Sequence, residues 1–468
     1  MLFNSFIFVV LVLITLLLYY IPLFYKFQIV ILIASSLIFY AYNQPVLLLL
    51  LLLSVSINII SSYFVVYGSM KHRKLYAIFG VVLNLSILLF FKYSPLFANT
   101  FFKSSDTIGD FLLTIPLPIG ISFFTFQGIS LVIDVYREKY CDSKDIVPKS
   151  FLNHSKRVLF FKGFFPQLIS GPIVKAHDFM PQIGTKYFSE IKWESAFKSI
   201  LLGYFLKMVV ADNLKDFTFW IAFPYFQGHS TLTLITMLFG YSCQIFADFA
   251  GYSLIAIGLA KLFGYNFNDN FNFPYISQSF KEFWKRWHIS LSSFLMEYLY
   301  FPLGGNKKGR IRTYINLMIV MLLGGLWHGA AWSYAIWGGF HGVALAFERF
   351  LSDKFKIKSN NIIKGLKVIM VFSFVTLAWL LFKLPNIEHV FEYFKCIFNN
   401  FRKDDNYSII TYIILYSSPV FLYHSFYLWK SHNSFIRFKN IEYAFYGIML
   451  FLIIVNSGSS GSFIYFQF

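Results

Sequence analysis

Four ionisable residues lie inside long apolar stretches of the sequence: Asp134, Asp248, His328 and His341. An ionisable residue within a membrane-spanning run costs about 2.5–3.5 kcal/mol on insertion scales, so each is a candidate functional group. Imidazole has an ordinary pKa of about 6.5 and is suited to exchanging protons near neutral pH. The two histidines are therefore the first candidates for acid-base chemistry.

His328 is flanked by glycines in the segment 324–329 (GGLWHG), near the middle of an apolar run from 312 to 346. Glycine allows close backbone approach and can break a helix, which would leave room for a substrate beside the ring. The alternative is a structural histidine whose hydrogen bonds are satisfied by a neighbouring helix. The residues by themselves leave both interpretations open.

His341 follows thirteen residues later, in the segment 337–342 (WGGFHG). If 312–346 is one straight helix, the two rings lie about 20 Å apart on different faces and cannot share a metal. No other histidine spacing is typical of a zinc site, so we expect no metal centre. We expect His341 to pack or to hydrogen-bond.

Other polar residues have weaker claims. His288 follows the segment 285–287 (KRW) and is either functional or a polar residue at the level of the lipid headgroups. Asp248 is expected to be the partner of a cation or of a helix terminus. Asp134 has Arg137 one turn away as an available partner.

Motifs of several other enzyme classes are missing from the sequence. No Gly-x-Ser-x-Gly elbow, Walker loop or dinucleotide fingerprint precedes a suitable helix, so hydrolase, ATPase and oxidoreductase functions lack support. Cys141, Cys243 and Cys396 lie far apart and form no metal or redox spacing.

The elements that must position these residues are membrane helices. The chain of 468 residues is 57% hydrophobic and only 13% charged, against about 25% charged in soluble domains. Its net charge of +18 comes from Lys and Arg in short segments between apolar runs, where they set membrane orientation. We therefore expect membrane lipid, and not nucleic acid, to surround the chain.

We predict an all-α polytopic integral membrane protein with roughly ten to twelve transmembrane helices, since a span needs about 20 apolar residues. The first apolar segment lacks a basic start and is followed by further spans, so we expect a retained helix. The candidate spans are 3–24, 28–42, 45–67, 75–97, 111–135, 195–223, 231–262, 312–346, 366–384, 407–427 and 441–458.

Basic connections follow the first, third and fifth of these spans, at Lys26, 71–74 and 137–157. By the positive-inside rule they face the cytoplasm, which predicts an extracytoplasmic N-terminus in a cytoplasmic membrane. The stretch 280–300 instead carries apolar and basic residues on opposite helical faces, so we predict an interfacial or re-entrant helix there.

No repeat or low-complexity tract interrupts the chain, and the polar connections are too short for a separate domain. We predict a single membrane domain over 1–468. Within it we distinguish N-terminal helices (1–110), a core that contains most of the candidate polar residues (111–350) and C-terminal helices (351–468).

Five segments together resemble the membrane-bound O-acyltransferase family, in its branch of alginate and peptidoglycan O-acetyltransferase membrane subunits. Their order and spacing across 110–350 carry the resemblance. The segments are 118–127 (PIGISFFTFQ) with 134–137 (DVYR); 164–173 (FFPQLISGPI); 248–253 (DFAGYS) with 269–275 (DNFNFPY); 283–292 (FWKRWHISLS) with 298–305 (YLYFPLGG); and 324–330 (GGLWHGA) with 337–342.

The resemblance implies that His328 matches the family's essential histidine and His288 its second polar position. It also implies that further residues line the substrate channel or support the site. One departure is Met296 and Glu297, where this branch usually has Arg-Asp, so any partner contact there must differ. The supporting residues are Asp248, Trp287, Trp327, His341 and Asn270.

The activity implied is acetyl transfer across the membrane, with no bound cofactor and with acetyl-CoA as the donor. His328 would be the base, and His288 would position the donor or stabilise the tetrahedral intermediate. The acceptor would be an extracytoplasmic polysaccharide, reached with a periplasmic or exported acetyltransferase partner. Teichoic acid D-alanylation, acylation of lipid or protein, and a non-enzymatic transporter or scaffold remain alternatives.

Overall fold

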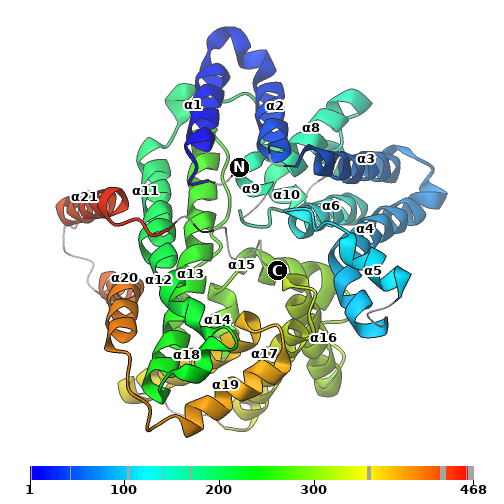
Figure 1. Cartoon of the computed structure of the whole chain (residues 1–468). Helices are drawn as coiled ribbons and strands as arrows, with labels where there is room; N and C mark the ends of the chain where they lie inside the picture. Colours follow the sequence, from blue (N-terminus) through cyan, green and yellow to red (C-terminus); the bar gives the residue numbers. More distant parts are fainter. Residues whose placement is uncertain are drawn as a thin grey trace. The chain divides into compact units, whose positions relative to one another are not determined.

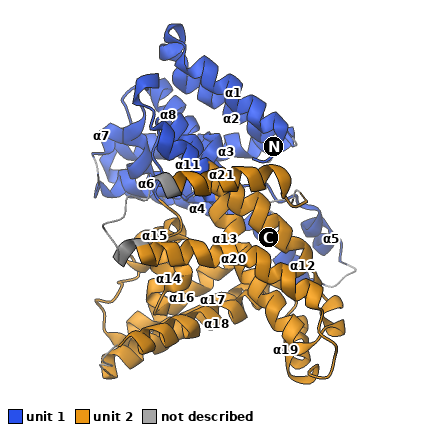
Figure 2. Cartoon of the chain, turned by 90° about the vertical axis from the view of Figure 1, so that its left-hand side faces the viewer, with its two compact units in different colours: residues 1–200, 253–268 blue, residues 201–252, 269–468 orange. Residues whose placement is uncertain are grey.

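The computed structural model describes residues 1, 3–42, 44–102, 106–140, 142–168, 171–355, 360–432, 439–459 and 461, and these contain helices and no strand. Cys141, which carries no functional signal, and part of the 164–173 motif lie outside them. The described residues form two compact units, coloured separately in Figure 2. Unit 1 comprises 1–200 and 253–268, and unit 2 comprises 201–252 and 269–468.

The helices of unit 1 come mainly from the first 200 residues (Figure 1). They are α1 (Phe6–Tyr20), α2 (Gln28–Ala41), α3 (Pro45–Tyr67), α4 (Arg73–Phe101), α5 (Thr107–Thr114), α6 (Ile121–Arg137), α7 (Ser143–Ile146), α8 (Phe151–Gly163), α9 (Phe165–Leu168), α10 (Ala176–Phe179) and the first part of α11 (Trp193–Tyr204).

The helices of unit 2 carry the remaining sequence, and α13 continues from it into the residues 253–262 of unit 1. They are α12 (Asp212–Thr218), α13 (Thr231–Leu262), α14 (Phe280–Arg286), α15 (Ile289–Leu295), α16 (Arg310–His328), α17 (Trp332–Lys354), α18 (Asn361–Lys383), α19 (Ile387–Asn399), α20 (Tyr407–His432) and α21 (Lys439–Val455).

Seven helical segments among the described residues are long and apolar enough to cross a membrane, and two shorter apolar helices, Phe6–Tyr20 and Glu442–Val455, accompany them. This supports the predicted all-α multi-pass membrane protein. The number is smaller than the ten to twelve crossings expected, because two predicted spans are divided and two others contain these shorter helices. The seven are Pro22–Ala41, Pro45–Tyr67, Met70–Phe101, Thr231–Leu262, Arg310–His328, Asn361–Lys383 and Tyr407–Trp429.

The two divided spans lie at 111–135 and 195–223. The first becomes α5 and α6, separated by a non-helical segment in which Gly120 has a φ of 78°. The second becomes α11, a π-helical turn (Phe205–Ala211) and α12. A π-turn inserts an extra residue per turn and re-aims the side chains that follow it.

The predicted helix 312–346 is two helices, which corrects the straight-helix expectation. The helix α16 ends at His328 and α17 begins at Trp332, and the two pack along one another (Figure 1). Their crossing needs glycine: a Cβ on Gly325 would lie 2.2 Å from the carbonyl oxygen of Tyr334, and one on Gly338 would lie 2.1 Å from that of Met321. The glycines around His328 therefore build a helical hairpin.

The predicted helix 280–300 is also interrupted. It consists of α14, a break at Trp287 and His288, α15, and a π-helical turn (Met296–Tyr300). His288 adopts a φ of 43°, in the left-handed region that a residue with a Cβ rarely occupies. Such strain persists only where the surroundings hold it, and it is frequent at functional sites.

The predicted division at 110 and 350 does not coincide with the two units, since 111–350 contributes to both. Within unit 1, buried polar side chains join α3 to its neighbours. Asn58 and Asn84 exchange side-chain hydrogen bonds of 3.0 and 3.1 Å, and Lys162 donates to the hydroxyl of Ser54 at 2.6 Å. Interhelical hydrogen bonds of this kind associate helices in lipid.

Candidate active site

The two histidines singled out from the sequence come together in unit 2. The rings of His288 and His328 lie with their centroids 6.1 Å apart, although forty residues separate them. Both are buried. The break before α15 supplies one ring and the last residue of α16 supplies the other, so two helix termini position the pair.

Asn270 fixes the orientation and the protonation of His288. Its Oδ1 accepts hydrogen bonds from the backbone N–H of Ser290 at 3.2 Å and from the Ser290 hydroxyl at 2.8 Å. Because a backbone N–H can only donate, the Nδ1 of His288, which lies 3.1 Å from the same oxygen, must carry a hydrogen. In the neutral ring the lone pair is then on Nε2, where it can accept a proton.

The backbone supports this arrangement. The N–H of Ile289 donates to the carbonyl oxygen of Asn270 at 2.9 Å, and Phe249 on α13 packs edge-on against His288 with centroids 4.6 Å apart. His288 lies between α14 and α15, outside the candidate spans. Burial lowers its pKa to about 3, so the ring is neutral at physiological pH.

An aromatic cluster packs around His328. Trp337 packs edge-on against His328 at 5.2 Å between centroids and contacts His341 at 4.8 Å. His341 therefore lies one indole away from His328, because the hairpin folds α17 back along α16. Its two ring nitrogens are buried and make no hydrogen bond within the described part of the chain. His341 packs among aromatic rings.

The two predicted supporting tryptophans belong to the same cluster. Trp327 lies 5.8 Å from His288 and 5.2 Å from His328, measured between ring centroids, and so contacts both. Trp287 is fully buried and packs against Trp379 of α18 at 5.0 Å. The structure thus brings together His288, His328, Asn270, Trp327 and His341, with Trp287 on the adjoining side.

Asp248 lies elsewhere in unit 2, in a buried ion cluster. The Nζ of Lys207 lies 2.7 Å from Asp248 Oδ1 and 2.7 Å from Asp212 Oδ1. A close helix crossing permits this, since a Cβ on Gly251 would lie 2.8 Å from the carbonyl oxygen of Gly203. The expectation that Asp248 is the partner of a cation is confirmed.

Sequence reasoning missed Lys207 and Asp212. Lys207 lies within the apolar run 195–223, so the rule that selected Asp248 would also have selected it. Asp134 has a contact that the sequence did not reveal: its Oδ2 lies 2.8 Å from Nδ1 of His177, which is on α10. His177 lies forty-three residues from Asp134, so no local pattern reveals that contact.

No group of three or more His, Cys, Asp or Glu side chains that could hold a metal ion occurs among the residues that the structure describes. What the site does offer is a neutral histidine with its lone pair on Nε2 beside a second histidine, in surroundings built from tryptophan and phenylalanine. Such a pair can take a proton from a hydroxyl group and return it to a leaving group.

The fold and the site are those of a helical, multi-pass membrane protein with a buried histidine pair. Sequence comparison gives the family. The model of the membrane-bound O-acyltransferase family matches residues 154–384, which include both histidines and the ion cluster. The chain is 34% identical to a peptidoglycan O-acetyltransferase of Helicobacter pylori over 441 residues, covering 86% of this chain and 81% of the relative. This chain belongs to the membrane-bound O-acyltransferase family and is an O-acyltransferase.

Two further relatives mark the range of the similarity. The chain is 38% identical to a probable alginate O-acetylase of Pseudomonas aeruginosa over 328 residues, which cover 69% of this chain and 60% of the relative. It is 30% identical to a teichoic acid D-alanyltransferase of Bacillus subtilis over 286 residues, 58% of this chain and 70% of the relative.

Proposed function

We propose that this protein transfers acetyl groups across the membrane for O-acetylation of an extracytoplasmic polysaccharide. The observation that carries the proposal is the buried pair of His288 and His328, with ring centroids 6.1 Å apart, in a chain 34% identical to a peptidoglycan O-acetyltransferase over 86% of its length. Peptidoglycan and an alginate-like polymer are the two acceptors that the relatives suggest.

The proposed reaction joins the acetyl carbon to an acceptor hydroxyl and breaks its bond to the donor sulfur. His328 takes the hydroxyl proton as the hydroxyl oxygen attacks the thioester, and then returns that proton to the departing thiolate. Atoms and charge balance without a metal or a second co-reactant. The acetyl donor would be acetyl-CoA.

The tautomer of His288 refines its proposed role. With Nδ1–H held by Asn270, a neutral His288 has no N–H at Nε2 to donate to an oxyanion. It can instead accept a hydrogen bond there, either from the reacting hydroxyl or from protonated His328. This favours a role in proton transfer over the stabilisation of a tetrahedral intermediate.

The proposed donor and acceptor lie on opposite sides of the membrane, which leads to the proposals on orientation and on a partner protein. Acetyl-CoA is cytoplasmic and a wall or capsule polymer is outside, so the site must be reached from both sides of the cytoplasmic membrane. The positive-inside rule, applied to the basic connections, supports an N-terminus outside the cytoplasm. A separate exported acetyltransferase would receive the acetyl group and pass it to the polymer.

D-alanyl transfer to teichoic acid is the nearest alternative chemistry. It is less favoured because the similarity to the D-alanyltransferase covers 58% of this chain at 30% identity, whereas that to the peptidoglycan enzyme covers 86% at 34%. Both would use the same histidines.

The test compares ester-linked acetate on isolated cell-wall and secreted polysaccharides from strains that express the wild-type chain, His328→Ala or His72→Ala at equal protein levels. His72 is exposed in a short turn before α4 and serves as the matched histidine control. We expect acetate on one polymer to fall to background in His328→Ala alone. Unchanged acetate in every fraction would reject the proposal, and ester-linked alanine lost in its place would assign D-alanyl transfer.

A further inference from the structure

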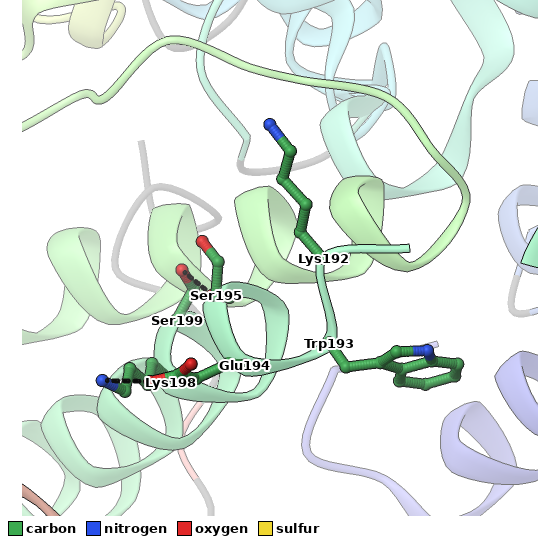
Figure 3. Close-up of a pocket in the computed structure, with 6 residues that line it drawn as sticks. All are labelled: Lys192, Trp193, Glu194, Ser195, Lys198 and Ser199. Carbon is green, nitrogen blue, oxygen red and sulfur yellow. Dashed lines mark hydrogen bonds and ion pairs between the residues drawn. The ribbon is translucent and has the colours of Figure 1, made fainter. Parts of the chain in front are cut away.

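A hollow of about 510 Å³ in unit 1 lies at the start of α11. It is polar on one side and aromatic on the other. Figure 3 shows Lys192 and Trp193 extending in different directions from the point where the chain enters the helix, with serine hydroxyls on the first turns. We call it the Lys192 pocket, and its lining residues are Lys192, Trp193, Glu194, Ser195, Lys198 and Ser199.

The pocket is surrounded by more positive than negative charge. Lys192 is exposed, and Lys198 forms an ion pair of 2.9 Å with Glu194, drawn as a dashed line in Figure 3. Behind the lining, the Nζ of Lys261 donates to the hydroxyls of Ser195 at 2.9 Å and Ser199 at 3.2 Å. Three ammonium groups against one carboxylate leave a formal charge of +2.

A ladder of aromatic rings stands beside the pocket. Trp193 contacts Phe188 at 5.2 Å and stacks on Phe197 at 5.8 Å between centroids, with an interplanar angle of 20°. Phe188 and Phe197 are 54% and 56% exposed. Exposed aromatic rings next to lysines are typical of a protein surface at the level of the lipid headgroups.

The contacts of the preceding segment place the pocket at a particular end of unit 1. Gln28, which follows the basic connection at Lys26, donates to the carbonyl oxygen of Lys186 at 2.8 Å, and Arg157 donates to that of Met180 at 2.8 Å. The pocket therefore lies at the end that carries the basic connections. By the positive-inside rule this end faces the cytoplasmic leaflet, which is rich in anionic lipid.

We propose that the Lys192 pocket binds the phosphate of an anionic glycerophospholipid in that leaflet. The ammonium groups of Lys192 and Lys198 and the hydroxyl of Ser195 would donate to the phosphate oxygens, while the Ser199 hydroxyl donates to the carbonyl oxygen of Ser195 at 2.9 Å. Trp193 and Phe197 would lie against the glycerol and the start of the acyl chains. The aromatic ladder favours a lipid over a soluble phosphate, which would make no use of exposed apolar rings.

The test measures binding of phosphatidylglycerol to the purified full-length protein in detergent by native mass spectrometry. A variant that carries both Lys192→Gln and Lys198→Gln is compared with the wild type. A basic residue near an anionic lipid is typically responsible for about a fivefold change in affinity, so we expect roughly 25-fold weaker binding in the double variant. Phosphatidylcholine should bind weakly to both proteins.

The matched control carries Lys144→Gln and Lys149→Gln, which remove two exposed lysines from the basic connection 137–157. It has the same net charge as the pocket variant and should bind phosphatidylglycerol within about twofold of the wild type. An equal loss of phosphatidylglycerol affinity in the two variants would show that binding depends only on net charge, and would overturn the proposal. So would wild-type binding in the pocket variant, or a pocket that binds coenzyme A and not lipid.

Discussion

Two buried polar clusters in unit 2 share the helix α13, whose neighbouring residues Asp248 and Phe249 contribute to one cluster each. Asp248 belongs to the ion cluster with Lys207 and Asp212, whereas Phe249 packs against His288 in the histidine site. In the first cluster a cation lies 2.7 Å from each of two carboxylates. In the second, a neutral imidazole is held by an amide oxygen among aromatic rings.

The two clusters differ in whether their charges are fixed or can change during a reaction. Burial of an ion pair costs desolvation energy, which the attraction between close, well-placed charges offsets. Removal of one partner therefore leaves an isolated buried charge that nothing offsets. A neutral histidine avoids that cost, and it can gain and lose a proton during a reaction. The ion cluster therefore suits a fixed helix crossing, and the histidine site suits chemistry.

The largest effect is expected in the histidine site. We expect His328→Ala and His288→Ala each to lower acetyl transfer about 10²- to 10⁴-fold, the usual contribution of general acid-base catalysis, without loss of folded protein. In the proposed reaction the two rings act on one proton, so the double variant should be little slower than the worse single variant. Rates measured with labelled acetyl donor in membrane vesicles test this, and multiplicative losses would show independent roles.

Substitutions in the ion cluster should lower the stability of the protein and should not act specifically on the transfer reaction. Lys207→Met leaves Asp212 and Asp248 buried without their cation, and we expect about 3–5 kcal/mol of destabilisation. Thermal unfolding monitored by size-exclusion chromatography measures it. Adding Asp248→Asn and Asp212→Asn should recover much of the loss. A folded Lys207→Met protein without activity would instead place the lysine in the reaction.

The helical hairpin that presents His328 gives a third comparison. Gly325→Ala would place a Cβ 2.2 Å from the carbonyl oxygen of Tyr334, and overpacking of this kind typically costs about 1–3 kcal/mol. Both stability and transfer rate should fall. Gly365→Ala on α18 is the control, since among the described residues no atom beyond its chain neighbours and its own helix backbone lies within 4 Å of the added Cβ. Equal behaviour of the two variants would show that the close crossing is unimportant.

Asn270→Ala isolates the hydrogen bond that sets the tautomer of His288. Loss of one buried partner typically costs about 1–3 kcal/mol of folding free energy, and we expect a loss of stability in that range. We also expect roughly a tenfold lower transfer rate, because the ring of His288 is no longer held in one tautomer. Asn270→Asp keeps an acceptor for Nδ1–H and should retain more activity than Asn270→Ala. The reverse order would argue that the amide, and not its oxygen, is what the site needs.

The smallest effect is expected at His341. Its ring packs among Trp284, Trp337 and Phe374 without a hydrogen bond to the described residues, so His341→Phe preserves most of the contacts. We expect transfer within a few-fold of the wild type and a change in stability under about 1.5 kcal/mol. A loss as large as that of His328→Ala would bring His341 into the reaction.

The sequence predicted which residues are candidates more completely than it predicted how those residues are arranged. The cost of an ionisable group in an apolar run identified Asp134, Asp248, His328 and His341. His288 was a weaker candidate from the residues, and the resemblance gave it a role and added Asn270. The same cost applies to Lys207, whose carboxylate partners lie five and forty-one residues away. No local pattern shows which of two distant groups will pair, since that depends on how the helices cross.

By itself the sequence determined a helical membrane protein and a buried histidine in a glycine-rich segment. Composition and the length of apolar runs are enough for this, because the bilayer admits few other structures. Only the tertiary structure decided that 312–346 folds as a hairpin and that 280–300 breaks at His288. Glycine permits a helix to end but does not require it, and the packing of Gly325 against Gly338 and the hydrogen bonds of Asn270 select these breaks.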